Sequence, residues 1–303
     1  SQALGVLTRI YAAELRYKKI NAFSFKKSVG NPAGCFYLKE GQELSDIEML
    51  SIAKEQKGFV SEVIFCTPQS DNSFQLKYYS SECAVQFCGH GTIACITELI
   101  KNNEILRFLP EITITTNKGE LKVYNELEQL DAVFITAPAP QYLTLSAKLD
   151  DIVCKLGVSM DAIDKNYSVN LIDVGVRTLI IPVKNLKCVI GIHPNELELK
   201  EYCLSNGIES ILVFTFDVVN KTNIARTRVF APKFGYLEDP ATGSGNSAFG
   251  YYMLKHNLWN GETISIEQNA ELNNYNIVKM KIIAGKVLIG GNAAVKIEGK
   301  YFL

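Results

Sequence analysis

A glutamate inside an apolar strand is the first candidate for chemistry. Glu62 lies in the stretch FVSEVIF, where valine, isoleucine and phenylalanine surround it. Removing water from a carboxylate disfavours its charged form and raises its pKa toward neutrality. Such a carboxyl group can accept and return a proton near neutral pH, as a general acid/base requires. The alternative is a glutamate on the solvated face of a half-buried strand, because glutamate is rarely buried without a partner.

The turn FCGHGT, which holds Cys88, Gly89 and His90, is the second candidate. It precedes an apolar run of helical length, so His90 is expected at a helix N-terminus. There the helix dipole disfavours imidazolium, and a neutral imidazole could orient a substrate or relay a proton. The same position lowers the pKa of a thiol, so Cys88 could act as a base. A capping histidine and a space-filling cysteine are the alternatives.

The third candidate is EDPATGSG, in which Asp239 and Pro240 precede a glycine-rich turn and a second apolar run. The first backbone N–H groups of a helix have no intrahelical partner, and glycines let an anion approach them. The amides of Gly243, Ser244 and Gly245 are therefore expected to cradle a carboxylate, with Asp239 beside it or capping the helix. A nucleotide P-loop is excluded because no lysine follows the glycines before Lys255.

Composition narrows the class of protein. The 303 residues suffice for two domains, and 31 basic against 32 acidic residues give no field that gathers nucleic acid or anionic lipid. A small-molecule partner is expected. No apolar run reaches a membrane span and the first residues do not form a signal peptide, so we expect a soluble, cytoplasmic protein. Eight cysteines in mostly apolar runs indicate reduced, mostly buried thiols, and only three histidines without metal-ligand spacing argue against a metal.

The chain also carries a faint internal repeat. CGHGTIACITELIKNN at residue 88 aligns with TGSGNSAFGYYMLKHN at residue 242, and upstream GFVSEVIFCT at residue 58 aligns with GIESILVFTF at residue 207. Two pairs in the same order at nearly equal offsets indicate a duplication. Each half would then bury one apolar helix inside a curled sheet, and pseudo-symmetry would point both helix N-termini at the cleft between the halves.

Short alternating runs rich in Val, Ile, Phe, Tyr and Thr predict antiparallel or mixed sheet, so the expected class is α+β. Strands are predicted over 16–25, 33–38, 61–67, 74–80, 111–117, 120–125 and 131–138. Helices are predicted over 45–56, 91–103, 148–157, 195–207 and 245–257.

In their order and spacing, five stretches of the sequence resemble the phenazine-biosynthesis PhzF-like family, whose members are relatives of diaminopimelate epimerase. The stretches are VGNPAGCFYL, FVSEVIF, FCGHGT, RVFAPKFGYLEDPATGSG and VLIGGNAAVKIEG. The resemblance implies two pseudo-symmetric domains, each a mostly antiparallel mixed sheet wrapped around a central helix, with the site between them and no cofactor. It places the domains at 17–137 with 292–303 and at 138–291, with residues 1–16 as an extension. Relatives are commonly dimeric, which implies a homodimer.

The resemblance also assigns roles. The glutamate that carries the proton between substrate carbons matches Glu62, with Ser61 beside it in the substrate site. His90 and Asp239 match residues that line the site. Gly243 and Ser244 match the backbone donors to the substrate carboxylate, and Gly89 and Gly245 belong to the same two turns. In the related epimerases a base cysteine stands at the place of Cys88.

We therefore expect a cofactor-independent isomerase of a small carboxylate, with Glu62, His90 and Asp239 as its catalytic residues. Two other classes stay open: an amino-acid epimerase or racemase that uses Cys88, and a binding protein that keeps the site without the chemistry. The sequence departs from the family at Asn21, where an aspartate is usual, and at Ala84, where a further acid is usual. These departures concern the substrate more than the type of reaction.

Overall fold

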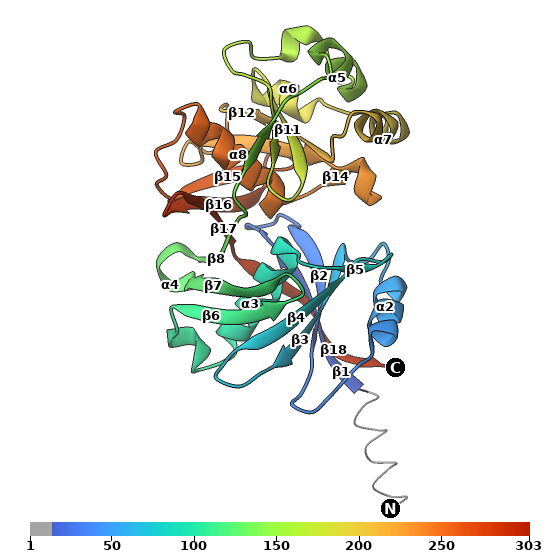
Figure 1. Ribbon diagram of the computed structural model, residues 1–303. Helices are drawn as coiled ribbons and strands as arrows, with labels where there is room; N and C mark the ends of the chain where they lie inside the picture. Colours follow the sequence, from blue (N-terminus) through green and yellow to red (C-terminus); the bar gives the residue numbers. More distant parts are fainter. Residues whose placement is uncertain (1–13) are drawn as a thin grey trace, which may run out of the picture. The chain divides into compact units, whose positions relative to one another are not determined.

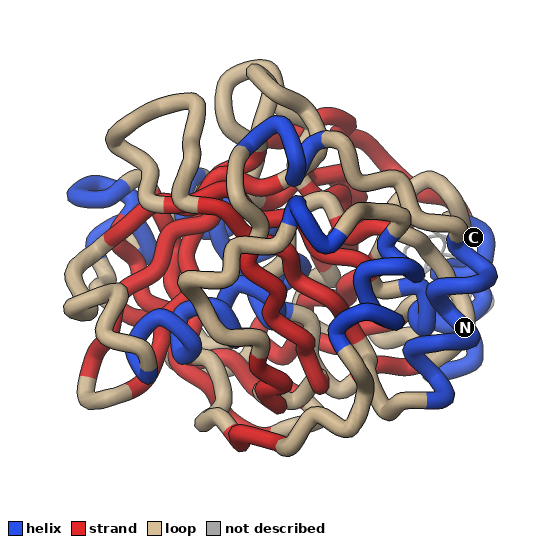
Figure 2. Tube along the Cα trace, turned by 90° about the horizontal axis from the view of Figure 1, so that it is seen from above, coloured by secondary structure: helices blue, strands red, loops and turns tan. Residues whose placement is uncertain are grey.

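The computed structural model describes residues 14–303. They form two compact units. Unit 1 holds residues 14–22, 30–135 and 291–303, and unit 2 holds 23–29 and 136–290. Figure 2 shows strands in red and helices in blue mixed along the whole described chain.

Unit 1 is a sheet whose strands lie in the order β18-β1-β2-β3-β4-β6-β7-β8, with the short β5 also paired to β4. The pairs β2–β3 and β4–β6 are parallel, and the others are antiparallel. The strands are β1 (Glu14–Ala22), β2 (Asn31–Tyr37), β3 (Glu62–Pro68), β4 (Phe74–Tyr79), β5 (Ala84–Val85), β6 (Glu111–Thr116), β7 (Gly119–Glu126), β8 (Ala132–Thr136) and β18 (Ala293–Phe302). The helices are α2 (Asp46–Glu55), α3 (Gly89–Lys101), η1 (Leu106–Phe108) and α4 (Leu127–Leu130).

Unit 2 repeats this plan. Its strands lie in the order β9-β10-β11-β12-β13-β15-β16-β17, with the short β14 on β13, and β11–β12 and β13–β15 are its parallel pairs. The strands are β9 (Gln141–Leu143), β10 (Asn170–Asp173), β11 (Arg177–Pro182), β12 (Ser210–Thr215), β13 (Ala225–Phe230), β14 (Glu238–Asp239), β15 (Ile264–Gln268), β16 (Asn276–Ile283) and β17 (Lys286–Gly291). The helices are α5 (Leu149–Leu156), η2 (Met160–Ala162), α6 (Leu186–Ile190), α7 (Glu196–Ser205), η3 (Pro232–Phe234) and α8 (Gly243–Lys255).

Each unit encloses one helix. In unit 1, α3 contacts β1, β2, β3 and β18, and in unit 2, α8 contacts β10, β11, β12 and β16 (Figure 1). The buried positions of α8 run without a break from Gly245 to Met253, so sheet surrounds this helix on nearly all sides. Each enclosed helix begins at one of the two glycine turns of the sequence repeat, so the repeat corresponds to the same helix in both units.

The outer face of each sheet has its own helices and core. In unit 1, Met49 and Ile52 of α2 pack on Val63 and Phe65 of β3. In unit 2, apolar side chains of α5, α6 and α7 pack on β11 and β12. The alternating residues of β3 therefore have fixed directions: Val63 and Phe65 face α2, and Glu62 and Ile64 face the side of α3.

The units differ from the expected domains mainly in residues 23–29, while residues 136–137 fall in unit 2 and residue 291 in unit 1. The strand expected over 16–25 ends at Ala22, because Phe23 takes a left-handed backbone conformation with φ 62°. Phe23 then accepts a hydrogen bond from the Ile277 amide at 3.1 Å, and the Phe25 ring stacks on Tyr275. These contacts explain why residues 23–29 belong to unit 2. At the other end, β1 begins at Glu14, inside the expected extension, whose residues 1–13 lie outside the described chain.

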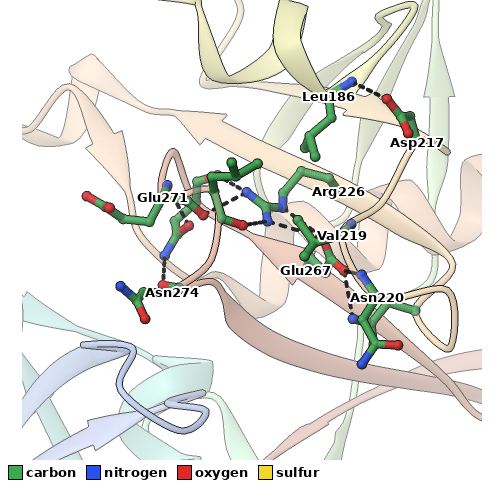
Figure 3. Close-up of polar contacts among 11 residues, drawn as sticks. Leu186, Asp217, Val219, Asn220, Arg226, Glu267, Glu271 and Asn274 are labelled. Carbon is green, nitrogen blue, oxygen red and sulfur yellow. Dashed lines mark hydrogen bonds and ion pairs between the residues drawn. The ribbon is translucent and has the colours of Figure 1, made fainter.

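A buried ion pair fixes two loops of unit 2 (Figure 3). Arg226 and Glu267 are both fully buried, and the Arg226 Nε lies 3.1 Å from Glu267 Oε1. Glu267 also accepts from the amides of Val219 and Asn220. Arg226 donates to the carbonyls of Asn269, Glu271 and Leu272. Both charges are thus paired and hydrogen-bonded, as buried charges require.

Among residues 14–303 no helix has the length and hydropathy needed to cross a bilayer. The same residues contain no disulfide, and the side chains of Cys35, Cys66, Cys95 and Cys203 are buried. Cys83 and Cys154 are exposed and Cys88 and Cys188 are half-buried, so the expectation of mostly buried thiols was too broad.

Candidate active site

Glu62 is the first residue of β3. It lies opposite Ala33 in the parallel pair with β2, and the amide of the preceding Ser61 donates to the Pro32 carbonyl at 3.1 Å. Strand alternation turns Glu62 away from α2. The side chain is half-buried and its Oε1 atom is shielded from solvent. The carboxyl group therefore lies at the start of the strand and is only partly exposed to solvent.

The start of α3 brings Cys88 and His90 together. Cys88 is the N-cap residue, with extended backbone, and its Sγ accepts a hydrogen bond from the Gly91 amide at 3.4 Å. The His90 Nδ1 lies 3.1 Å from the same sulfur. The thiol thus occupies the place of a usual serine or threonine cap and also faces an imidazole.

Ser61 links this helix start to β3. Its Oγ lies 2.9 Å from His90 Nε2, 2.7 Å from the Pro32 carbonyl oxygen and 2.7 Å from Asn31 Oδ1. A carbonyl only accepts and a hydroxyl has one proton, so the hydroxyl that donates to Pro32 must accept from Nε2–H. This leaves the Nδ1 lone pair facing the Cys88 thiol. The chain of contacts therefore favours one neutral tautomer of His90.

The electrostatics of His90 favour the neutral form that either tautomer requires. Desolvation lowers the pKa of His90 to about 4, although its contact with the Pro32 carbonyl acts in the opposite direction. The neutral form that the helix dipole predicts is thus favoured here mainly by loss of water. A neutral imidazole can accept at one nitrogen and donate at the other, which the Ser61 and Cys88 contacts use.

The turn GHGT requires a glycine at position 91 because the helix lies close to β3 there. A Cβ atom on Gly91 would lie 2.6 Å from Cδ1 and 2.9 Å from Cγ1 of Ile64. Ile64 is fully buried on the same side of β3 as Glu62. The missing side chain lets the first turn of α3 approach the strand that carries Glu62.

The second helix start repeats the geometry of the first. Thr242 is the N-cap of α8, and its Oγ1 accepts from the Gly245 amide at 3.3 Å and lies 3.2 Å from Ser244 Oγ. Thr242 and Ser244 stand 154 residues after Cys88 and His90, at the repeat offset. The Gly245 amide, one of the three expected to cradle a carboxylate, donates to the Thr242 side chain instead. Gly243 is buried and Ser244 is exposed.

The two adjacent acids of β14 have different tasks. Glu238 receives a two-pronged ion pair from Arg228, with Nε to Oε2 at 3.0 Å and Nη2 to Oε1 at 2.8 Å. Arg228 is buried and also donates to the carbonyls of Val189 and Ile192. Glu238 is therefore a structural residue. The half-buried Asp239 points to the opposite face of the strand by alternation.

Five further residues support these turns and were not expected from the sequence. Asn31 and Pro32 contact Ser61, Thr242 caps α8, and Gln268 and Asn246 hold the turn before α8. Thr242 could have been found from the repeat, because it aligns with Cys88. The others come from distant segments and carry no local signal. Within residues 14–303 no group of three or more His, Cys, Asp or Glu side chains could hold a metal ion.

Comparison with known proteins identifies the family. The family model of phenazine biosynthesis-like proteins, PhzC-PhzF, matches residues 20–299, and the chain belongs to this family. The chain is 25% identical to the "Uncharacterized isomerase YfhB" of Bacillus subtilis, over 94% of this chain and 95% of that protein. It is 23% identical to the trans-2,3-dihydro-3-hydroxyanthranilate isomerase of Pseudomonas chlororaphis, over 84% and 86% of the two chains.

Solved structures confirm the fold. The PhzF-family phenazine biosynthesis protein of Bacillus anthracis superposes with a TM-score of 0.84 at 21% identity, over 96% of this chain and 99% of that chain. A hydroxyproline epimerase of Agrobacterium vitis superposes with a TM-score of 0.60 at 12% identity, over 96% and 93%. The expected α+β fold, with two similar units each wrapped around a helix, is confirmed. The sequence relatives from Bacillus subtilis and Pseudomonas chlororaphis both bear the name isomerase, and at the level of enzyme class the chain is an isomerase.

Proposed function

We propose that the protein moves a proton between two carbons of a small carboxylate substrate, with Glu62 as the group that takes and returns it. The observation that carries the proposal is the half-buried carboxyl group of Glu62, which has one shielded oxygen and comes directly after Ser61, the residue whose hydroxyl contacts His90. Family membership and the isomerase named in Pseudomonas chlororaphis support the same type of reaction.

The proposed step balances without an oxidant or reductant. Ionised Glu62 removes a proton from one substrate carbon, and the electron pair of that C–H bond forms a new C=C bond. The electron pair of the original C=C bond takes a proton from the Glu62 carboxylic acid at another carbon. One proton leaves and one returns, so the substrate is isomerised and Glu62 recovers its starting form.

Unit 2 contributes the binding groups in this proposal. The Gly243 and Ser244 amides at the start of α8 bind the substrate carboxylate, since first-turn amides favour an anion. Asp239 lies on the strand that leads into this helix and contacts polar groups of the substrate. Gly89 and Ser61 line the corresponding turn of unit 1. Both ring nitrogens of His90 have protein partners, so a hydrogen bond from His90 to substrate replaces one of them.

An epimerase that uses Cys88 is the second candidate, because the Cys88 sulfur lies 3.1 Å from His90 Nδ1, which could remove its proton. The repeat weighs against a symmetric pair of bases. In unit 2 the position of Cys88 is held by Thr242, and the strand that corresponds to β3, β12, begins with Ser210 and contains no acidic residue. Neither proposed base has a counterpart of its own type in the second half.

Exchange with deuterated water separates these functions. Small carboxylates, including trans-2,3-dihydro-3-hydroxyanthranilate and trans-4-hydroxy-L-proline, would be incubated with the protein in D2O, and deuterium incorporation followed by NMR. We expect Glu62→Gln to slow incorporation by about 100-fold or more and Cys88→Ser by only a few-fold, since a lost general acid/base costs about 10²–10⁴-fold.

The exposed Glu82 supplies the matched control, and Glu82→Gln should exchange at the wild-type rate. The reverse pattern, with Cys88→Ser inactive and Glu62→Gln active, would establish the epimerase. Binding of a carboxylate without deuterium incorporation by the wild-type protein would establish the binding protein instead.

A further inference from the structure

Two fully buried carboxamides hold the turn between Asp239 and α8. Gln268 is the last residue of β15 and Asn246 lies in the first turn of α8, and neither side chain is exposed to solvent. Buried carboxamides require a full set of hydrogen-bond partners, because a buried polar group without a partner destabilises the fold. Their partners therefore show what this pair of side chains does.

Gln268 binds the turn at two backbone positions. Its Oε1 accepts from the Thr242 amide at 3.0 Å and from Asn246 Nδ2 at 2.7 Å. Its Nε2 donates to the Asp239 carbonyl at 2.8 Å. Asn246 Nδ2 also donates to the Thr242 carbonyl at 2.8 Å, and its Oδ1 accepts from Thr227 Oγ1 at 3.0 Å. The backbone on both sides of Pro240 and Ala241 is thus tied to one strand end.

The orientation of the Gln268 amide follows from its neighbours. The Thr242 N–H group can only donate and the Asp239 carbonyl can only accept. Rotating the carboxamide by 180° would place its NH2 group against the N–H donors of Thr242 and Asn246. It would also place its oxygen against the Asp239 carbonyl oxygen. A single orientation therefore satisfies all three contacts, and the group acts as a clamp of fixed direction.

Unit 1 builds the same fold without this clamp. At the positions of Asn246 and Gln268 it has Thr92 and Thr116, the latter also at the end of its strand. Thr92 Oγ1 donates to the Cys88 carbonyl at 2.8 Å and contacts the Tyr78 hydroxyl, while Thr116 donates to the Gly119 carbonyl. The topology of the repeat therefore does not require the carboxamide pair. What unit 2 adds at this turn is Asp239.

We infer that Gln268, seated by Asn246, is a positioning residue for the reaction. It fixes the backbone of residues 239–242, and through it the direction of the Asp239 carboxyl group and of the Gly243 and Ser244 amides. The inference rests on the proposed function of that turn. Since misplacement of a binding group by about 1 Å can cost about 100-fold in rate, this clamp is a point where catalysis is sensitive.

Gln268→Glu tests the direction of the clamp. As a protonated acid the introduced carboxyl group can still donate to the Asp239 carbonyl and accept from Thr242. Once ionised it has no proton to donate and repels that carbonyl. Burial raises the pKa of such a carboxyl group above its ordinary value, so the protonated form persists to a higher pH than in a solvated glutamate and is lost as the pH rises. With trans-2,3-dihydro-3-hydroxyanthranilate in D2O, the rate relative to wild type should fall about tenfold or more from pH 5.5 to pH 8.5.

Gln268→Leu removes all three contacts, and amide hydrogen exchange should then rise in a peptide that covers 239–246. Asn223→Ala is the matched control, because it removes a buried hydrogen bond to Glu267 in the same unit without touching the turn. It should raise exchange around 217–223 and leave the exchange of the turn and the relative pH profile unchanged.

Three results would overturn the inference: unchanged amide exchange of the turn in Gln268→Leu, a Gln268→Glu rate that follows wild type at every pH, or a pH-dependent loss in Asn223→Ala as well. If wild type acts on another carboxylate of the panel, that compound is the probe. If wild type exchanges none of them, the proposed function fails, and an inference about positioning for that reaction fails with it even where the amide exchange changes.

Discussion

At the scale of single residues, adjacent residues on one strand have separate tasks. Glu238 is held by Arg228, whereas Asp239 leaves the strand on the other face. In the same way Val63 belongs to the outer core of unit 1, whereas Glu62 faces the side of α3. The direction of a side chain, which follows from one step along a strand, separates structural acids from candidate catalytic acids.

His90 gives a prediction about protonation. We expect its imidazole to stay neutral between pH 8 and about pH 5.5, because desolvation lowers its pKa to about 4. Between the ordinary value near 6.5 and about 4, the unfolded chain binds a proton that the folded chain does not. The contribution of His90 to the free energy of unfolding is therefore complete above about pH 6.5 and declines as the pH falls toward 4.

NMR titration of the ring protons measures this directly. The chain has three histidines, so the signal lost in His90→Gln assigns the resonance. A His90 midpoint above about pH 6 would contradict the prediction and the hydrogen-bond pattern from which we assign the tautomer.

At the scale of elements, the two enclosed helices begin in the same way with different chemistry. Cys88 and Thr242 each accept a hydrogen bond from the amide three residues later and each contact the side chain two residues later. The N-cap geometry is common to both because the helix needs its first amides satisfied. The side chains differ, so the duplicated elements can bind and react differently.

The ion pair between Arg226 and Glu267 gives a prediction about the elements of unit 2. Glu267→Gln keeps the volume of the side chain but leaves the Arg226 guanidinium buried without a countercharge. We expect the free energy of unfolding to fall by about 3–5 kcal/mol, as for other buried pairs that lose one partner. Urea unfolding measures the change.

The exposed pair of Lys57 and Glu82 is the comparison, with both side chains about 70% exposed. Glu82→Gln should leave the free energy of unfolding almost unchanged, because solvent screens such pairs. Equal losses in the two variants would show that Glu267 contributes no more than a surface charge.

At the scale of the whole molecule, the chain returns to its first unit at the end. β18 pairs with β1 from Glu14 against Phe302 to Ala22 against Ala293, and Lys101 of α3 donates to Asn292 at 2.8 Å. Unit 1 is therefore assembled from segments at opposite ends of the sequence. Its completion needs the last strand after all of unit 2 has been made.

A deletion tests this dependence. Removal of residues 292–303 should lower the unfolding temperature of unit 1, because β1 loses β18, one of its two antiparallel partners, and becomes an exposed edge. Unit 2 should keep its own transition in calorimetry. Removal of Leu303 alone, which is exposed and lies outside β18, should leave both unchanged. A single unaltered transition in the longer deletion would contradict the prediction.

Much of the fold was predictable because its signals are local. The alternation of VSEVIF predicted the strand of Glu62, the glycine turns predicted the starts of α3 and α8, and all five expected helices are present. The repeat predicted two similar units. The end of β1 was missed, because the left-handed conformation of Phe23 depends on contacts with Ile277 and Tyr275 far along the chain.

The sequence by itself determined the elements, their duplication and the residue types available for chemistry, since periodicity and turn residues act over a few positions. Only the tertiary structure decided which partners those residues have. The contact of Ser61 with His90, the ion pair of Glu238 with Arg228 and the hydrogen bond from Gln268 to the Asp239 carbonyl join separate segments of the chain. Such contacts follow from how the sheets close around their helices, which no local pattern encodes.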